Sequence, residues 1–455
     1  MDVKGKKVVV VGLGRSGVGA ANLLHEFGAS VTVTDKKKPD ELVSYIEELR
    51  PGIQCCLDGH PPELFGEADF IVISPGVPLS IAPLKSASER GISIIGELEL
   101  AYKAARSKTA FLAITGTNGK STTTSLLDAM LKKGGYATLL GGNIGNALTK
   151  ALTEKISADF IVAEVSSFQL ETVYDFKPKG AAILNVTPDH LDRYASMADY
   201  IDAKCRIFLN QDRDDFIVLN ADDPMTRDIV KRIAIQSGRT GPQIFYFSRR
   251  KEIAGAWYKN GVINFGLPGL SSFTLDPSSF RIRGVHNIEN AMAASVMALL
   301  SGCNPGSVSA ALAEFPGLEH RLEFVREING VSFINDSKGT NVGAVVKSLE
   351  SFNVPVVLIA GGRDKDGDFT GLRSLVREKV RALVLIGEAR DKIRKAIGDS
   401  TRIIVEDSLE DAVKEAREIA SPGDVVLLSP ACASFDMFRD FEHRGRRFKE
   451  LVGNL

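Results

Sequence analysis

Short runs of aliphatic and β-branched residues recur along the whole chain and alternate with stretches of helical character. They read KVVVVG, SVTVTD, DFIVIS, AFLAIT, DFIVAEVS, GAAILNV, DFIVLN, VSFIND, VPVVLIAG, RALVLIG and DVVLLSP. Because these runs are continuous and do not alternate with polar residues, they indicate strands that are buried on both faces. Such strands form mainly parallel sheets covered by helices. The sequence therefore predicts the α/β class.

A new series of strand and helix patterns begins at two places, which divides the chain into three α/β segments. The first restart lies between IIGELELAYKAARSK and AFLAIT, and the second lies near FPGLEHRLEF, after a long helical segment. A length of 455 residues suits about three domains of ordinary size. We therefore predict domains at residues 1–100, 101–317 and 318–455.

Composition narrows the class of partner. The chain has 44% hydrophobic and 25% charged residues and a formal net charge of -1, so there is no electrostatic argument for nucleic acid or an anionic membrane as the main partner. The valine run in MDVKGKKVVVVGLG is too short for a signal peptide, and no apolar run reaches the ~20 residues that span a bilayer. Five cysteines without a C-x-x-C pair fit a reducing cytoplasm.

The stretch ITGTNGKSTT nearly matches the phosphate loop G-x-x-x-x-G-K-[ST], but Ile114 stands where the first glycine would be. It follows a predicted strand at 110–115 and precedes a predicted helix at 121–133, the context that such a loop needs. Its glycines would let backbone amides approach phosphate oxygens, Lys120 would pair with the β- and γ-phosphates, and Ser121 would ligate Mg²⁺. The alternative is an ordinary strand-to-helix turn with a solvated lysine.

A second glycine motif, VVGLGRSG, contains Gly12, Gly14 and Gly17 between a predicted strand and a predicted helix, and Asp35 ends the next strand. Taken literally, this pattern indicates a nicotinamide dinucleotide site with Asp35 on a ribose. The same geometry holds any diphosphate at a helix N-terminus, so a nucleotide sugar fits equally well. A third possibility is that the glycines serve only tight strand-to-helix packing.

A third group of residues follows strands of the central segment. EVSSFQLE places Glu164 at the end of a strand, NVTPDHLDRY places His190 and Asp192 after another, and Lys204 lies on the following predicted helix. Ligands bind at the carboxyl ends of strands in open α/β sheets. Glu164 and the Ser121 hydroxyl would form a hard oxygen site for Mg²⁺, and His190 could bind a second metal ion. Alternatively, the histidine and the lysine are solvated surface groups.

The chain resembles the Mur ligases of peptidoglycan synthesis in seven motifs that occur in the same order. They are GTNGKS, EVSSFQLE, NVTPDHLDRY, HNIENAMAA, EHRLE, INDSKGTN and SPACASFDMF. The resemblance runs through the whole chain. SSFQLE, DSKGTN and SPACASFD are similar to the member that adds D-glutamate, whereas GTNGKS and HN..N also occur in folylpolyglutamate synthetase. The resemblance implies a Rossmann-like N-terminal domain for the UDP end of the substrate, a central P-loop ATPase-type domain with a mainly parallel sheet, and a Rossmann-like C-terminal domain for the amino acid.

The resemblance also implies a reaction. ATP would phosphorylate the L-alanine carboxylate of UDP-N-acetylmuramoyl-L-alanine (UDP-MurNAc-L-Ala), and the amine of D-glutamate would then attack the acyl phosphate. The implied cofactors are ATP and two Mg²⁺ ions, for which Mn²⁺ may substitute. The expected enzyme is a cytoplasmic monomer with small-molecule substrates and with neither a nucleic acid nor a membrane partner.

By the same resemblance each ligand has a set of expected contacts. The catalytic residues are Lys120, Glu164, His190 and Lys204. The metal ligands are Ser121, Glu164, His190 and Lys204, the last as a carbamate. The ATP contacts are Gly116, Thr117, Asn118, Gly119, Lys120, Ser121, Thr122, Asn287, Asn290, Arg321 and Asp336. The UDP-substrate contacts are Gly14, Arg15, Ser16, Asp35, Lys36, Ser74, Pro75, Gly76, Asn143 and His190. The D-glutamate contacts are Lys338, Thr340, Lys365, Ser434, Phe435 and Phe441.

Two other functions stay open at this stage. A nicotinamide dehydrogenase would explain VVGLGRSG and Asp35 but not GTNGKS, Glu164 or Lys204. A nonenzymatic nucleotide-binding regulator would keep the loops without needing the metal ligands. Among ligases, folylpolyglutamate synthetase is the alternative, and it should lack a UDP-binding first domain.

Overall fold

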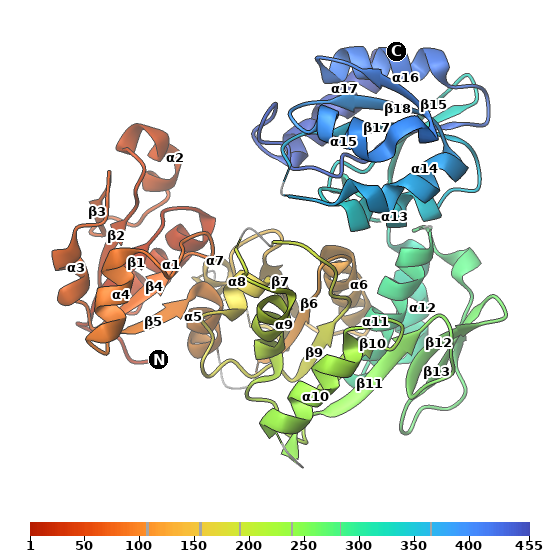
Figure 1. Cartoon of the computed structure of the whole chain (residues 1–455). Coiled ribbons are helices and arrows are strands. Elements are labelled where there is room, and N and C mark those ends of the chain that lie inside the picture. The colour runs from red at the N-terminus through yellow and green to blue at the C-terminus, as the bar shows by residue number, and fades with distance from the viewer. Residues whose placement is uncertain (106–108, 154–156, 191–192, 238–239, 283, 365) are drawn as a thin grey trace. The chain divides into compact units, whose positions relative to one another are not determined.

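The structure is a computed structural model. It describes residues 1–105, 109–153, 157–190, 193–237, 240–282, 284–364 and 366–455. The described chain forms two compact units. The first comprises Met1–Val186, Ala198–Asp276 and Ala291–Leu312, and the second comprises Thr187–Met197, Pro277–Asn290 and Ala313–Leu455. Each sheet of the fold lies within one unit, two sheets in the first and one in the second (Figure 1).

The N-terminal sheet has the strand order β3-β2-β1-β4-β5, and all of its described pairs are parallel. Its strands are β1 (Lys7–Val11), β2 (Ser30–Thr34), β3 (Gln54–Cys56), β4 (Phe70–Ile73) and β5 (Ser93–Gly96). Its helices are α1 (Arg15–Glu26), α2 (Val43–Ile46), α3 (Pro62–Gly66), α4 (Ala82–Glu89) and α5 (Glu97–Ala104). The order reverses direction between β1 and β4, the point where open α/β sheets bind their ligands.

The central sheet has the order β14-β13-β12-β11-β10-β9-β6-β8-β7 among the described residues. Its strands are β6 (Ala110–Thr115), β7 (Thr138–Gly142), β8 (Phe160–Glu164), β9 (Gly180–Ile183), β10 (Phe216–Asn220), β11 (Gln243–Ser248), β12 (Gly255–Lys259), β13 (Val262–Gly266) and β14 (Thr274–Leu275). The helices of this segment are α6 (Lys120–Lys133), α7 (Leu148–Thr153), α8 (Ser167–Leu170), α9 (Met197–Cys205), α10 (Thr226–Ser237), α11 (Val285–Leu300) and α12 (Pro305–Glu314).

One edge of the central sheet is antiparallel, because β13 pairs in that sense with both β12 and β14. The connection between β12 and β13 is a two-residue turn in which Asn260 and Gly261 both have positive φ, 54° and 83°. Asn-Gly favours this turn because both residues tolerate the left-handed region. The parallel strands confirm the predicted α/β class, and the hairpin is an element that the list of apolar runs did not include.

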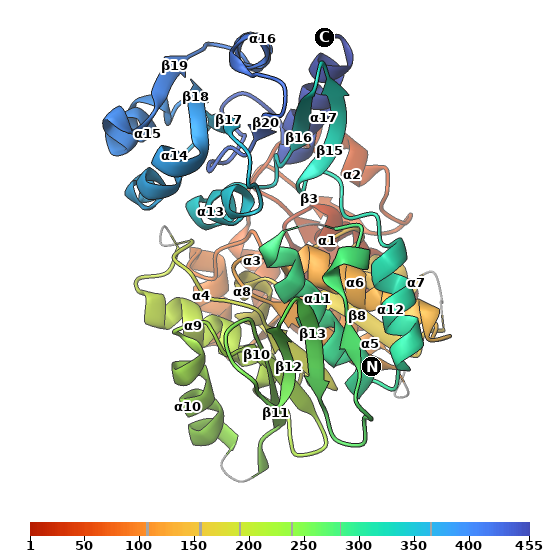
Figure 2. The ribbon, with the colours of Figure 1, turned by 90° about the vertical axis from the view of Figure 1, so that its right-hand side faces the viewer.

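The C-terminal sheet has the order β15-β16-β20-β17-β18-β19, in which only the described pair β15–β16 is antiparallel. Its strands are β15 (Glu323–Ile328), β16 (Val331–Asn335), β17 (Val356–Gly361), β18 (Val380–Ile386), β19 (Arg402–Val405) and β20 (Val425–Leu428). Its helices are α13 (Val342–Glu350), α14 (Arg373–Lys379), α15 (Arg390–Ile397), α16 (Leu409–Ile419) and α17 (Phe441–Gly453). Two apolar cores fill its faces, one beneath α13, α14 and α15 and the other beneath α16 and α17 (Figure 2).

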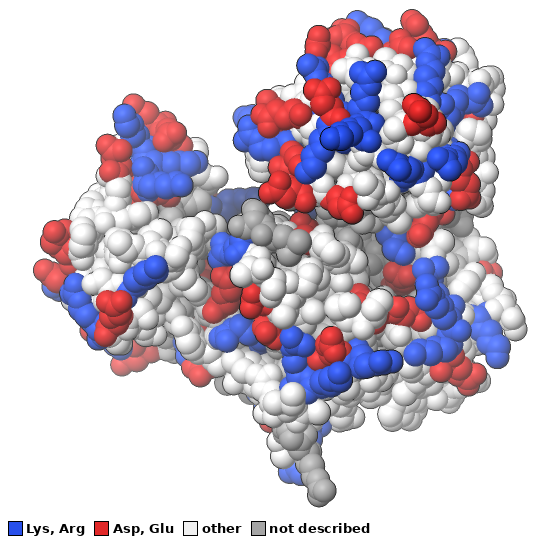
Figure 3. Space-filling model, viewed as in Figure 1, with Lys and Arg blue, Asp and Glu red and all other residues white. Residues whose placement is uncertain are grey.

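The predicted boundaries at residues 100 and 317 stay predictions, because compactness divides the described chain into two units and not three. Within the described ranges, no helix is both long enough and apolar enough to cross a membrane. On the face drawn in Figure 3, acidic and basic side chains are interspersed.

Candidate functional site

The predicted phosphate loop connects β6 to α6. The strand spans 110–115 as predicted, and the helix begins at Lys120, one residue before the predicted start. Gly119, the residue before the helix, has a left-handed φ of 85°, which favours glycine. The Lys120 ammonium donates to the carbonyl oxygens of Gly116 and Thr117 at 2.9 and 2.8 Å. The loop and the first turn of the helix therefore form a cradle of the kind that holds phosphate groups at a helix N-terminus.

Asn185, two residues beyond β9, braces this loop. Its side-chain oxygen accepts from the backbone N–H of Asn118 at 2.8 Å, and its side-chain nitrogen donates to the Asn118 carbonyl at 3.0 Å. Its backbone carbonyl accepts from the N–H of Thr117 at 2.9 Å. Sequence reasoning did not assign Asn185 a role, although it is the first residue of the motif NVTPDHLDRY.

Glu164 ends β8 next to the same sheet edge. The residue is only 2% exposed, and its Oε1 accepts from the side-chain nitrogen of Asn143 at 2.8 Å. Its other oxygen, Oε2, is buried and makes no hydrogen bond within the described part of the chain. Leaving a carboxylate oxygen buried without a partner is costly, and a bound cation would satisfy it. The donor set therefore fits Mg²⁺, which prefers hard oxygen ligands.

Lys204 lies on α9 and is 2% exposed. Its ammonium donates to the carbonyl oxygen of Gly116 at 3.1 Å and lies 4.3 Å from the centre of the Tyr200 ring. Lys120 donates to the same Gly116 carbonyl, so the structure brings two cationic side chains to one oxygen atom of the phosphate loop. Such a concentration of positive charge suits an anionic ligand.

The N-terminal glycine motif lies at the strand-order reversal of the first sheet. Asp35 follows β2, and its two oxygens accept from the backbone N–H groups of Leu13 and Lys37 at 2.7 and 2.9 Å. Ser74 follows β4 and donates to the carbonyl of Gly12 at 2.8 Å. Two predicted substrate contacts thus also hold the glycine loop in shape. Six other predicted contacts lie in the same three loops or at the start of α1: Gly14, Arg15, Ser16, Lys36, Pro75 and Gly76. The last two, Asn143 and His190, follow β7 and β9 of the central sheet.

Asp336 follows β16 in the second unit and is buried. Its Oδ2 accepts from the hydroxyls of Ser348 and Ser429, each at 2.7 Å, and its Oδ1 accepts from the N–H of Leu322 at 3.3 Å. Burial raises the pKa of Asp336 to about 6, and the hydrogen bonds and the charge of Arg321 oppose that rise. The carboxylate therefore links β16, α13 and the end of β20, close in sequence to Lys338.

Two of the residues predicted to bind D-glutamate, Lys338 and Phe441, lie together at the start of α17. The Lys338 ammonium lies 3.6 Å from the centre of the Phe441 ring. Ser434 is buried, whereas Phe435 is 61% exposed. Arg444, which sequence reasoning did not select, is fully buried and donates to the hydroxyl and carbonyl of Ser337 and to the carbonyl of Cys432. This guanidinium ties the segment after β16 to the segment after β20.

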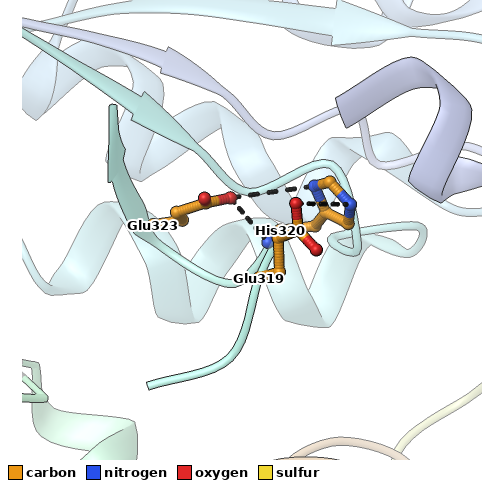
Figure 4. A group of neighbouring side chains, drawn as sticks. All are labelled: Glu319, His320 and Glu323. Atoms are coloured by element: carbon orange, nitrogen blue, oxygen red, sulfur yellow. Dashed lines mark hydrogen bonds and ion pairs between the residues drawn. The ribbon is translucent and has the colours of Figure 1, made fainter. Parts of the chain in front are cut away.

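Glu319, His320 and Glu323 form the cluster drawn in Figure 4, with ligand atoms within 4.8 Å of one another. Both carboxylates already have a cationic partner, because Lys449 donates to Glu319 at 2.5 Å and to Glu323 at 2.9 Å. Asn335 donates to Glu323 at 3.0 Å and lies 2.9 Å from the His320 ring nitrogen Nδ1. The cluster is therefore an ion-pair network that fixes the segment around Arg321.

Ser121 and Thr122 lie in the first turn of α6 and are buried. Several further predicted residues belong to the second unit or lie outside the described chain. His190 has a positive φ of 57°, and its backbone N–H donates to the Asp189 side chain at 3.0 Å. The side chains of Asn290 and Asn287 are hydrogen-bonded at 3.1 Å. Lys365 and Asp192 lie outside the described residues.

Comparison with known proteins identifies the family. Residues 6–96 match the model described as Mur ligase MurD-like, N-terminal domain, residues 114–298 match the Mur ligase middle domain, and residues 320–432 match the Mur ligase, glutamate ligase domain. The chain belongs to the Mur ligase family. A relative named UDP-N-acetylmuramoylalanine--D-glutamate ligase, from Geotalea daltonii, is 49% identical over 457 residues, which cover 100% of this chain and 99% of that protein. A relative of the same name from Pelotomaculum thermopropionicum is 45% identical over 458 residues, with the same coverage.

Solved Mur ligases share the fold of this one. The UDP-N-acetylmuramate-alanine ligase MurC of Thermotoga maritima superposes with a TM-score of 0.60 at 20% identity, over 99% of both chains. MurF of Acinetobacter baumannii gives a TM-score of 0.62 at 17% identity, over 100% of this Mur ligase and 91% of that chain. At these identities the likeness shows the fold alone. Family membership favours a ligase over the dehydrogenase and the regulator considered from the sequence.

Proposed function

We propose that this Mur ligase adds D-glutamate to UDP-MurNAc-L-Ala with hydrolysis of ATP to ADP and phosphate, as a cytoplasmic monomer. The observation that carries the proposal is the 45–49% identity, along the whole chain, to relatives named for that reaction. A first domain of the MurD-like type supports it over folylpolyglutamate synthetase. The site supports a ligase because a phosphate loop, a buried carboxylate and a buried lysine meet at one sheet edge.

The first chemical step would take place at the phosphate loop. An oxygen of the L-alanine carboxylate attacks the γ-phosphorus of ATP, and the bond to ADP breaks. Lys120 would exchange its two loop carbonyls for phosphate oxygens, where negative charge grows in the transition state. The backbone amides at the start of α6 would hold the remaining phosphates, with Thr117, Asn118 and Thr122 beside them.

Two Mg²⁺ ions, or Mn²⁺ ions in their place, would neutralise the phosphate charge and polarise the transferred group when bound. The residues that would hold them are Ser121, Glu164, His190 and Lys204. Glu164 suits this role because Asn143 occupies one of its oxygens and leaves the other available. A metal ion at Oε2 would remove the cost of that unpartnered oxygen.

Lys204 would act as a carbamate. A neutral lysine amine adds CO₂ and loses a proton, which converts a cation into an anion. In this structure that change would remove one of two ammonium groups that contact the Gly116 carbonyl. It would also place anionic oxygens inside the buried site, where a cation needs a partner.

In the second step the amine of D-glutamate attacks the acyl carbon, phosphate leaves with the electrons of the C–O bond, and the amine loses a proton. Lys338, Thr340, Ser434 and Phe441 would form the D-glutamate pocket with Phe435. Lys365 would bind a substrate carboxylate there. Asn287, Asn290, Arg321 and Asp336 would contact ATP. The UDP end would bind at the glycine loop of the first domain, with Asn143 and His190 toward the muramoyl part.

The test is phosphate release with ATP, Mg²⁺, UDP-MurNAc-L-Ala and a panel of amino acids. D-glutamate should support turnover, whereas L-lysine, meso-diaminopimelate and L-alanine should not. A preference for one of the other amino acids would place the chain in another branch of the family. Calorimetry that detects tight NAD⁺ binding and no response to UDP-MurNAc-L-Ala would overturn the assignment of the first domain.

A further inference from the structure

Helix α5 carries a buried carboxylate that the proposed chemistry does not use. Glu97, its first residue, is 1% exposed. Its Oε1 accepts from both the backbone N–H and the hydroxyl of Thr149, at 2.7 and 2.8 Å. Thr149 is the second residue of α7, in the segment that follows β7 of the central sheet. Glu97 therefore fastens the start of α7 to the end of the N-terminal sheet.

Helix α7 is also held by α1, the helix that begins at the glycine loop, and Figure 1 shows α7 beside α1 and α5. The contact depends on Gly19, because a Cβ atom there would lie 2.6 Å from the Thr149 hydroxyl and 3.0 Å from the Lys150 nitrogen. Any larger residue would push α7 away. The start of α7 is thus fixed from two sides by the domain that carries the predicted UDP site.

The position of α7 fixes the geometry of the turn that precedes it, residues 141–146. Gly141 packs tightly there, since a Cβ atom would lie 2.9 Å from the Asn146 carbonyl oxygen and 3.0 Å from the Leu148 side chain. Gly142 donates to the same Asn146 carbonyl at 3.2 Å. Asn143 lies within this turn. Its N–H donates to the backbone carbonyl of Glu164 at 2.9 Å, and its side chain donates to Glu164 Oε1 at 2.8 Å.

We propose that Glu97 is a positioning residue for the metal-binding carboxylate. By holding the start of α7, it keeps the 141–146 turn in the geometry that directs Asn143 onto Glu164 Oε1 and leaves Oε2 for the cation. The path runs from Glu97 through Thr149 and the turn to Asn143 and Glu164. It links the domain with the predicted UDP site to the metal site, and it rests on the proposed function for the identity of the cation.

Glu99 on the same helix provides a matched control. It is fully buried, and its carboxylate accepts from the backbone N–H groups of Tyr174, Asp175 and Phe176 at 2.9–3.1 Å. Glu99 therefore also fastens α5 to the central segment. Among the described residues, the side-chain partner of Glu164 is Asn143, and Glu99 instead binds the backbone of the segment 174–176. Replacing Glu99 should lower the melting temperature of the protein without changing the orientation of the Glu164 side chain.

The experiment measures Mn²⁺ binding by electron paramagnetic resonance in the full chain with a nonhydrolysable ATP analogue, together with the Mg²⁺ dependence of phosphate release. Glu97→Leu should weaken Mn²⁺ binding about tenfold, because both hydrogen bonds to Thr149 are lost. Glu97→Gln should stay within about threefold of the wild type, since its amide oxygen can accept both bonds. Glu99→Leu should lower the melting temperature comparably and leave Mn²⁺ binding within about twofold.

Wild-type Mn²⁺ affinity in folded Glu97→Leu, or equal weakening by Glu99→Leu, would overturn the proposal. If Glu97→Leu does not fold, Thr149→Val decides, because it removes one bond to Glu97 and keeps the side-chain shape; the expected weakening is about threefold. An unchanged affinity in that variant would count against the proposed path. Failure of the wild type to release phosphate with D-glutamate would reject the proposed function instead, and the comparison of Mn²⁺ affinities would still stand.

Discussion

Removing the amide of Asn185 should weaken ATP binding although this side chain was not selected as an ATP contact. In the structure its two polar atoms form a closed pair of hydrogen bonds with the backbone of Asn118, at 2.8 and 3.0 Å. That backbone belongs to the predicted phosphate loop, whose amides would face phosphate oxygens. Asn185→Ala deletes both bonds and so removes this restraint on the Asn118 peptide.

The magnitude follows from the number of bonds. Each neutral hydrogen bond contributes ~0.5–1.5 kcal/mol net, so two bonds contribute ~1–3 kcal/mol to the binding conformation of the loop. Since 1.4 kcal/mol corresponds to tenfold in affinity, ATP should bind roughly 5- to 140-fold more weakly. Asn185→Asp keeps the acceptor for the Asn118 N–H but places a carboxylate oxygen against the Asn118 carbonyl, so it should be at least as weak as Asn185→Ala.

The assay is a calorimetric titration of ATP with Mg²⁺, supported by the KM for ATP in phosphate release. Asn220→Ala is the control, because Asn220 ends the neighbouring strand β10 and its side-chain oxygen accepts from the N–H of Asp222 in its own loop, at 2.9 Å. That variant should bind ATP like the wild type. A folded Asn185→Ala protein with wild-type ATP affinity would refute the reasoning.

Three further variants test the site. Lys120→Ala should fold but lose roughly 10²–10³-fold in kcat, because the lysine meets charge that grows in the transition state; near-wild-type turnover would remove the phosphate-loop assignment. Lys204→Ala should be nearly inactive and partly rescued by acetate, which supplies carboxylate oxygens; full activity without additive would exclude the carbamate. Burial raises the pKa of Asp336 from 3.8 to about 6, so the folded protein favours the protonated carboxyl. The contribution of this group to the free energy of unfolding is therefore fully present below pH ~4 and is lost as the pH rises through 6. Asp336→Asn should remove ~3 kcal/mol of this pH dependence, measured by urea unfolding between pH 4 and 7.

The fold was predictable where the sequence repeats one simple signal. Continuous apolar runs gave the parallel strands, including β6 at 110–115 and β8 ending at Glu164. The β12–β13 hairpin was missed because neither strand is a continuous apolar run: β13 alternates between partly exposed and buried residues, and β12 passes from buried residues at its start to an exposed residue at its end. Asn260 and Gly261 carried the turn signal that could have revealed it.

Most of the predicted site residues that the structure describes lie at strand ends, in the loops after strands or at the first turns of helices, because those are the places where motifs combine glycine with polar groups. Lys204, in the last turn of α9, is an exception. The supporting residues could not be found in that way. Arg444 lies in the charged stretch FEHRGRRFKE, which reads as a solvated helix, and yet it is buried among backbone carbonyls. Glu97 presents the same problem, since its partner Thr149 lies 52 residues further along the chain. Only tertiary packing shows which charged residues are inside.

The shortened phosphate loop shows how such support compensates for a missing sequence feature. With Ile114 in place of the first glycine, the loop has fewer residues with which to brace its own turn. The segment after the neighbouring strand β9 supplies the brace instead. The oxygen and the nitrogen of the Asn185 side-chain amide both bind the Asn118 backbone, and the Asn185 backbone carbonyl accepts from the Thr117 N–H. Gly116 permits the close approach, since a Cβ atom there would lie 3.1 Å from the Leu184 side chain. The loop is thus held by Asn185, so a shift of that residue would move the Asn118 and Thr117 peptides with it.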